Sequence, residues 1–224
     1  MQFNNQTPQS VGGILSQLRQ RGTTTHRFKL PMTAANAKLF LQTALQFQVE
    51  ERGREFIMND NISEILDRLS RVLTEGSYHF GLHFCGGCGN GKTTFVKAFQ
   101  TVINRLQLKI EEECYGNWAI RIMDARAIAD LAKNDNDEWQ QLCRIPMLAI
   151  DDLGTEPVEV LDYGNVLYPI VDLLTRRYDR QLFTVITTNL TSEEIRAKYG
   201  ERIADRLNEM MTKIVFRDSS FRRP

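Results

Sequence analysis

Long apolar runs and cysteines are scarce in this chain of 224 residues, and neither sign of charge is in excess. No stretch approaches the roughly 20 consecutive apolar residues that a membrane-spanning helix needs, so we expect no membrane partner. The opening residues, MQFNNQTPQS, lack the charged and then apolar pattern of a secretory signal. The 28 basic residues are balanced by 28 acidic ones, so the composition gives no sign of a protein that coats nucleic acid. We therefore expect a globular, cytoplasmic protein.

The few cysteines do not form a persuasive metal or redox site. Cys85 and Cys88 are spaced as C-x-x-C, which can bind zinc or carry a redox disulfide. No second such pair follows, and both residues lie within a glycine-rich stretch. We therefore expect small side chains packed near a tight turn, in a reducing compartment.

Residues 1–76 are predicted to form a helical N-terminal region. A short helix is expected near residues 11–20, and a second runs from a Thr33 cap to about residue 52. Apolar residues at helical spacing give this second helix one apolar face, which comprises Ala37, Phe40, Ala44 and Phe47. A third helix is expected to begin at an Asn61 N-cap, with Glu64 in a capping box, and to end at Gly76. These helices either form a small bundle or pack on the remainder of the chain.

Residues 77–224 alternate between strand and helix patterns, which predicts a parallel α/β sheet. Strands are expected at 81–85, 118–124, 146–152, 182–189 and 213–216. A helix is expected over 166–180, with Pro169 in its first turn and with Arg176 and Arg177 as surface charges. Thr191 and Glu194 form a capping box at the start of a later helix.

Residues 86–93, GGCGNGKT, fit the P-loop pattern G-x-x-x-x-G-K-[ST] between a predicted strand and a predicted helix. Glycines let backbone N–H groups approach phosphates closely, and the helix that comes after them points the positive end of its dipole at the phosphates. Lys92 adds a charge at the β- and γ-phosphates, and Thr93 offers a hydroxyl ligand to Mg²⁺. The expected nucleotide-binding residues are Gly86, Gly87, Cys88, Gly89, Asn90, Gly91, Lys92, Thr93 and Thr94.

The segment MLAIDDLGTE supplies the acidic residues that a P-loop site needs. Asp151 ends a buried strand and is placed to hold Mg²⁺. Asp152 follows at once and is placed to orient or deprotonate the attacking water, with Glu156 as the second choice of base. Asn189, which ends the strand FTVITTN, is placed to contact the γ-phosphate or to position the water.

Arginines near the end of the chain are candidates for completing the site. Arg202 and Arg206 lie four residues apart on one predicted helix, and such a face can reach the nucleotide of a neighbouring subunit. Arg222 lies in the terminal segment SSFRRP. Each of the three can equally be a solvated or paired surface charge.

These segments, in this order, resemble the DnaC/IstB-like branch of the AAA+ ATPases. The resemblance covers about residues 78–224 and is carried by GGCGNGKTT, LAIDDLGTE, TVITTNL, YGERIADRL and SSFR. It implies a P-loop AAA+ three-layer sandwich with a five-stranded parallel sheet and a nucleotide at a subunit boundary. It also implies that Asn189 is the sensor-1 residue, that Arg206 rather than Arg202 is the arginine finger acting in trans, and that Arg222 is sensor 2.

The sequence therefore suggests an ATPase that uses ATP and Mg²⁺, forms homo-oligomers with ATP and associates with single-stranded DNA. The resemblance implies a replicative helicase as partner, docked by the N-terminal helices, or a transposase if the chain is an IstB-like transposition helper. A metabolic P-loop kinase is disfavoured by DDLGTE and by the late arginine helix. An adaptor that binds ATP without hydrolysing it is the remaining alternative.

Overall fold

The structure is a computed structural model that describes residues 27–110, 116–218 and 221. The helix expected near residues 11–20 and the arginine at position 222 lie outside these residues. The described helices are α2 (Ala34–Glu50), α3 (Asp60–Glu75), α4 (Lys92–Leu106), α5 (Ala125–Asn134), α6 (Asn136–Leu142), α7 (Pro169–Asp179), α8 (Ser192–Tyr199) and α9 (Glu201–Met210). Among the residues described, none of the helices has the length and apolarity required to cross a bilayer.

Five strands form a parallel sheet in the order β2-β3-β6-β1-β7, as the alternating pattern predicts. They are β1 (Gly81–Gly86), β2 (Ile120–Asp124), β3 (Met147–Leu153), β6 (Phe183–Thr188) and β7 (Met211–Phe216). Since all are parallel and β3, β6 and β1 are neighbours, the residues that follow these three strands gather at one edge of the sheet. Binding sites of open α/β sheets lie at this edge.

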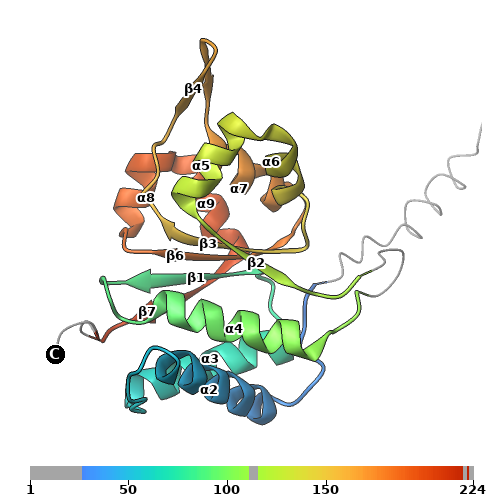
Figure 1. The fold of residues 1–224 in the computed structure, drawn as a ribbon, viewed down its shortest axis with the longest axis vertical. Coiled ribbons are helices and arrows are strands. Elements are labelled where there is room, and N and C mark those ends of the chain that lie inside the picture. The colour runs from blue at the N-terminus through green and yellow to red at the C-terminus, as the bar shows by residue number, and fades with distance from the viewer. Residues whose placement is uncertain (1–26, 111–115, 219–220, 222–224) are drawn as a thin grey trace, which may run out of the picture.

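Helices cover both faces of the sheet, which makes two hydrophobic cores. Figure 1 shows α4 against one face with α2 and α3 on the outer side of α4, and α5 to α9 against the other face. Side chains of β3 alternate between the two cores because successive residues of a strand point to opposite faces. Met147 and Ala149 join the first core, and Leu148 and Ile150 join the second. The N-terminal helices thus share the first core with the sheet.

Two details of the N-terminal helices differ from the expectation. The buried face of α2 comprises Ala37, Leu41, Ala44 and Leu45, whereas Phe40 and Phe47 are about half exposed, at 49% and 51%. The N-cap of α3 is Asn59, whose Oδ1 accepts from the backbone N–H of Ile62 at 2.8 Å. Asn61 was expected to be this cap, but it lies inside the helix and donates to Asp218 Oδ2 at 2.8 Å. The Thr33 cap and the Gly76 terminus are confirmed.

A hairpin of two short strands, β4 (Val160–Asp162) and β5 (Asn165–Leu167), separates β3 from α7 and projects away from the sheet (Figure 1). Tyr163 and Gly164 form its turn, both with positive φ, at 45° and 86°. Two such residues match the turn that fits the twist of a hairpin. The prediction of a helix from residue 166 was wrong at its start, because α7 begins at Pro169 and the residue before a proline disfavours helix.

Arg177 is fully buried, which contradicts its assignment as a surface charge. Its guanidinium donates to Thr184 Oγ1 at 2.8 Å and to the backbone oxygens of Leu142, Ile145 and Phe183 at 3.2, 2.9 and 2.7 Å. Burial lowers its pKa to about 9. Arg176 is exposed as expected, with its guanidinium 4.9 Å from the ring centroid of Trp139.

Candidate nucleotide-binding site

The glycine-rich loop joins the end of β1 to the start of α4 and rests on the end of β7. Gly86 has a φ of 145°, and a Cβ built there would lie 2.3 Å from the backbone oxygen of Phe216. Asn90 donates to the same oxygen at 3.0 Å and is 2% exposed. The strand, loop and helix that a P-loop requires are therefore present, and Asn90 also anchors the loop to the sheet.

Lys92 points back over this loop, and its Nζ is surrounded by oxygen atoms. It donates to the backbone oxygens of Gly86 and Gly87 at 2.8 and 2.7 Å, to Asn90 Oδ1 at 3.1 Å and to Asn189 Oδ1 at 2.7 Å. Burial lowers the pKa of the ammonium group from its ordinary value, and nearby groups that include the Asp152 carboxylate oppose this change. A cation held at the mouth of the loop is suited to a polyphosphate.

Thr93 and Asp151 meet as a magnesium site requires. The Thr93 hydroxyl donates to Asp151 Oδ1 at 3.0 Å, and the Thr187 hydroxyl donates to the same oxygen at 2.6 Å. Mg²⁺ at nucleotide sites is held by one or two protein oxygens together with phosphate and water oxygens, so this pair fits the ion. Thr187, on β6, orients the carboxylate and was missed by sequence reasoning, although the threonine pair before Asn189 was a signal.

A local break in the sheet presents Asp152 beside Asp151. The pairing of β3 with β6 shifts register between Ile150 and Leu153. Asp152 has a φ of 53°, and its backbone N–H donates to Thr187 Oγ1 at 2.8 Å. This left-handed residue lets two consecutive aspartates lie at the same edge of the sheet, which a regular strand forbids.

Glu156, the second choice of base, is used to hold its own loop. Its side chain is 0% exposed, accepts from the backbone N–H of Gly154 at 2.9 Å and accepts from the hydroxyl of Tyr199. Lys198 lies 3.6 Å from the same carboxylate and donates to the backbone oxygens of Gly154 and Glu156. Burial and the bond to Glu156 raise the pKa of Tyr199. These contacts fasten the DDLGTE loop to α8.

The late arginines are not brought to this loop by their described contacts. Arg206 lies against the end of α7, with its guanidinium 4.7 Å from the ring centroid of Tyr178 and 3.4 Å from Asp179 Oδ1. Its Nη1 is buried and finds no hydrogen-bond partner within the described part of the chain. Arg202 is exposed.

Phe221, unlike these two arginines, does reach the loop. The residue at position 222 is not described, but Phe221 before it donates its backbone N–H to the Gly89 oxygen at 3.0 Å. An arginine from the N-terminal region also lies here, since Arg52 Nη1 donates to Thr94 Oγ1 at 3.3 Å. No sequence signal connected residue 52 to the loop, because the two are joined only by the packing of α2 on α4.

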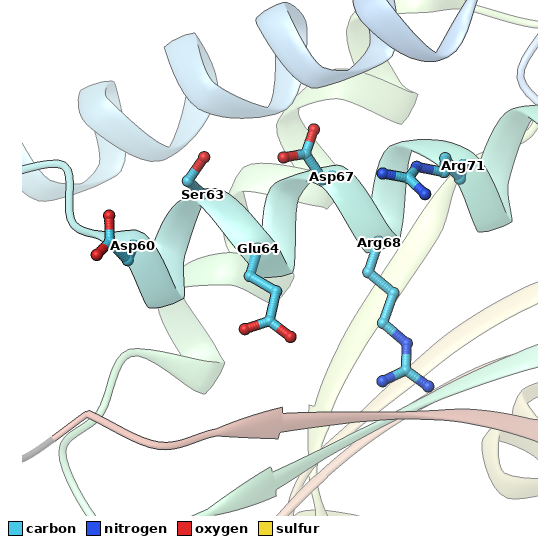
Figure 2. Close-up of a pocket in the computed structure, with 6 residues that line it drawn as sticks. All are labelled: Asp60, Ser63, Glu64, Asp67, Arg68 and Arg71. Carbon is cyan, nitrogen blue, oxygen red and sulfur yellow. The ribbon is translucent and has the colours of Figure 1, made fainter.

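The described residues offer no alternative metal centre, since they contain no cluster of three or more His, Cys, Asp or Glu side chains able to hold an ion. Cys85 is buried, as expected for a residue packed near a turn, whereas Cys88 is exposed. A hollow of about 480 Å³ lies along α3. Figure 2 shows its six lining residues on that one helix: Asp60, Ser63, Glu64, Asp67, Arg68 and Arg71. Ion pairs from Lys38 to Asp67 and from Arg217 to Glu64 explain much of this charge.

No protein-family model and no curated protein matches the chain, but solved structures do. The DnaC helicase loader matches with 22% identity and a TM-score of 0.53, over 72% of this chain and 93% of that one. DnaI matches with 18% identity and a TM-score of 0.54, over 78% and 93%. The replication initiator DnaA bound to AMPPCP and single-stranded DNA matches with 12% identity and a TM-score of 0.52, over 73% and 49%. At these identities the likeness shows the fold alone, which is the expected α/β sandwich around a five-stranded parallel sheet.

Proposed function

We propose that this chain is a Mg²⁺-dependent AAA+ ATPase that loads a replicative helicase onto single-stranded DNA. The observation that carries the proposal is the meeting of three strand ends around Lys92. Lys92 contacts Asn189 at 2.7 Å, and Thr93 contacts Asp151 at 3.0 Å. In the proposed site Lys92 binds the β- and γ-phosphates, and Thr93 and Asp151 hold Mg²⁺, which supplies charge neutralisation when bound.

Asp152 and Asn189 complete the proposed hydrolytic machinery. Asp152 accepts a proton from the attacking water or orients it. Asn189, as sensor 1, exchanges its bond with Lys92 for one with the γ-phosphate or that water. Support for this exchange comes from the fact that Lys92 and Asn189 already share a hydrogen bond at the mouth of the loop.

Oligomerisation supplies the remaining group in this proposal. Arg206 acts in trans on the nucleotide of a neighbouring subunit, and Arg222 acts as sensor 2. The assignment rests on the resemblance carried by YGERIADRL, and it requires the Arg206 guanidinium to leave its contacts with Tyr178 and Asp179 in the assembly. ATP binding then joins subunits, and hydrolysis releases them.

DNA and the helicase are the proposed partners. Two of the similar structures are a helicase loader and an initiator bound to single-stranded DNA. The outer face of α2 carries Leu39, Phe40 and Phe47, which are 64%, 49% and 51% exposed. An apolar helix face of this kind suits docking on a protein partner, and the N-terminal helices are the proposed helicase-binding region.

Phosphate release from ATP and Mg²⁺, with and without single-stranded DNA, tests the proposal. The wild type is expected to turn over and to form large assemblies with ATP, while Lys92→Ala loses nucleotide binding or turnover. Folded wild-type protein that gives no heat of binding with ATP and Mg²⁺ would contradict the whole assignment. Pull-downs with the replicative helicase and with a transposase separate the loader from a transposition helper with the same ATPase.

A further inference from the structure

Two arginines of the α2–α3 turn reach the edge of the candidate site. Arg52 follows α2 by two residues, and its guanidinium bonds the hydroxyl of Thr94, the third residue of α4, at 3.3 Å. The turn itself is well fixed, because the Arg52 N–H bonds the Val49 oxygen at 3.1 Å and the Gly53 N–H bonds the Glu50 oxygen at 2.8 Å. Arg52 is therefore placed at this position by the end of its helix.

Arg54 ties the same turn to Phe221. Its Nη1 donates to the Phe221 oxygen at 2.7 Å, and the Phe221 N–H donates to the Gly89 oxygen at 3.0 Å. A Cβ built at Gly91 would lie 3.8 Å from the Phe221 ring. The turn and Phe221 together border the glycine-rich loop and the first turn of α4.

We infer that Arg52 is a nucleotide-binding residue whose guanidinium contacts the α-phosphate. The inference rests on the proposed function. Lys92 and Thr93 serve the β- and γ-phosphates and Mg²⁺, on the side of α4 where Asp151 lies. Thr94 is one residue further around the helix, so its neighbour Arg52 meets a different part of the polyphosphate.

The chemistry of the side chain suits this role. The guanidinium stays charged and presents several N–H donors in a plane that matches a phosphate. At present Arg52 gives one long bond to a neutral hydroxyl. A charge-assisted bond to phosphate is stronger than a neutral one, so the guanidinium moves from Thr94 to the α-phosphate or bridges both.

The consequence separates Arg52 from the γ-phosphate machinery. ATP and ADP share the α-phosphate, so loss of Arg52 weakens the binding of both nucleotides to the same extent. Substitution of a group that contacts the γ-phosphate weakens the binding of ATP more than that of ADP. Since Arg52 lies two residues beyond the helix that carries the exposed Phe40 and Phe47, it also couples that helix to nucleotide binding.

Calorimetry of the full chain with ATP and with ADP, each with Mg²⁺, tests the inference. Arg52→Gln is expected to weaken both by roughly 10-fold, the size expected for a charge-assisted hydrogen bond. Arg52→Lys keeps the charge and loses the planar fork, so its affinities are expected to lie between those of the wild type and those of Arg52→Gln. Arg71→Gln is the matched control, because Arg71 is an exposed arginine of α3 that lines the hollow in Figure 2, and its affinities should equal those of the wild type.

Unchanged affinity of Arg52→Gln for both nucleotides overturns the inference and leaves the proposed function standing. A lower urea midpoint with unchanged affinity does the same, since it assigns the Thr94 contact a purely structural role. A loss confined to ATP overturns it as well, because the residue then reads the γ-phosphate. A wild type that binds neither nucleotide contradicts the proposed function itself.

Discussion

Asp152 holds a conformation that few residue types adopt readily. A left-handed backbone costs roughly 1–2 kcal/mol for most side chains, although Asn and Asp tolerate it best. The Thr187 hydroxyl, which bonds both the Asp152 N–H and the Asp151 carboxylate, keeps the pair in place. A strained residue beside a phosphate loop is expected where function requires its position, which favours Asp152 over Glu156 as the base.

Asp152→Asn is expected to keep ATP affinity and to lower turnover about 100-fold or more, as loss of a general base does. Asparagine keeps the size and the backbone preference of aspartate, so the fold should be unaffected. Glu156→Gln is expected to lower the free energy of unfolding by about 1–3 kcal/mol, because buried bonds to Tyr199 and Gly154 weaken. Phosphate release and urea unfolding measure the two effects. Normal turnover by Asp152→Asn, with none by a folded Glu156→Gln, would make Glu156 the base.

His83 makes stability depend on pH. Burial, and to a lesser extent Lys213, lowers the pKa of its imidazole from 6.5 to about 4. Between these values the unfolded chain binds the proton and the folded chain does not, so stability falls as the pH falls. The resulting loss in the free energy of unfolding approaches about 3 kcal/mol as the pH nears 4. Urea unfolding from pH 7 to pH 4.5 should show a shallower loss for His83→Gln than for the wild type; equal slopes would show that His83 does not titrate in this window.

The placement of a residue was predictable where it depends on neighbours in sequence. The spacing of GGCGNGKT and the strand before Asp151 marked Lys92, Thr93 and Asp151 as candidates, and the structure places the Thr93 hydroxyl against the Asp151 carboxylate. Arg177 and Arg52 were not predictable. An arginine on an amphipathic helix is usually exposed, and only the fold places three backbone oxygens and a hydroxyl around Arg177.

At the scale of elements, Arg177 joins α7 to three other segments around the second core. It lies on α7 and bonds oxygens at the end of α6, near the start of β3 and at the start of β6. Its guanidinium N–H groups supply hydrogen-bond donors to these buried oxygens. The expected helices and strands were mostly correct because their periodicity is local, but the β4–β5 hairpin was missed since its strands are only three residues each.

Arg177→Met is expected to lower the free energy of unfolding by at least about 3 kcal/mol, because it leaves buried oxygens without donors. Arg176→Met is the control, since Arg176 is exposed on Trp139 and such a contact is worth about 0.5–1 kcal/mol. Urea denaturation of the two variants compares adjacent arginines on one helix. Equal losses would contradict the role assigned to Arg177.

At the scale of the molecule, the sheet separates two cores, and each core supports a different set of candidate functional residues. The first core seats α2 and α3 on α4, so the exposed face of α2 and the phosphate loop belong to one packed unit. The second core carries α9 and the DDLGTE loop. A subunit interface that places α9 against a neighbour's loop would connect the two, and the sequence alone could suggest this only through the family resemblance.

Mixing two inactive variants tests that interface directly. Lys92→Ala should lose nucleotide binding or turnover but retains Arg206, and Arg206→Ala should bind ATP without hydrolysing it. In random one-to-one assemblies with head-to-tail interfaces, about a quarter of the sites combine an intact loop with an intact Arg206 from the neighbour, so phosphate release should return to about that share. The same mixture made with Arg202→Ala compares the other arginine of α9. Full turnover by Arg206→Ala alone would contradict its assignment. If instead the Arg206→Ala mixture stays inactive, while Arg202→Ala is inactive alone and recovers in its mixture, then Arg202 rather than Arg206 serves the neighbouring site.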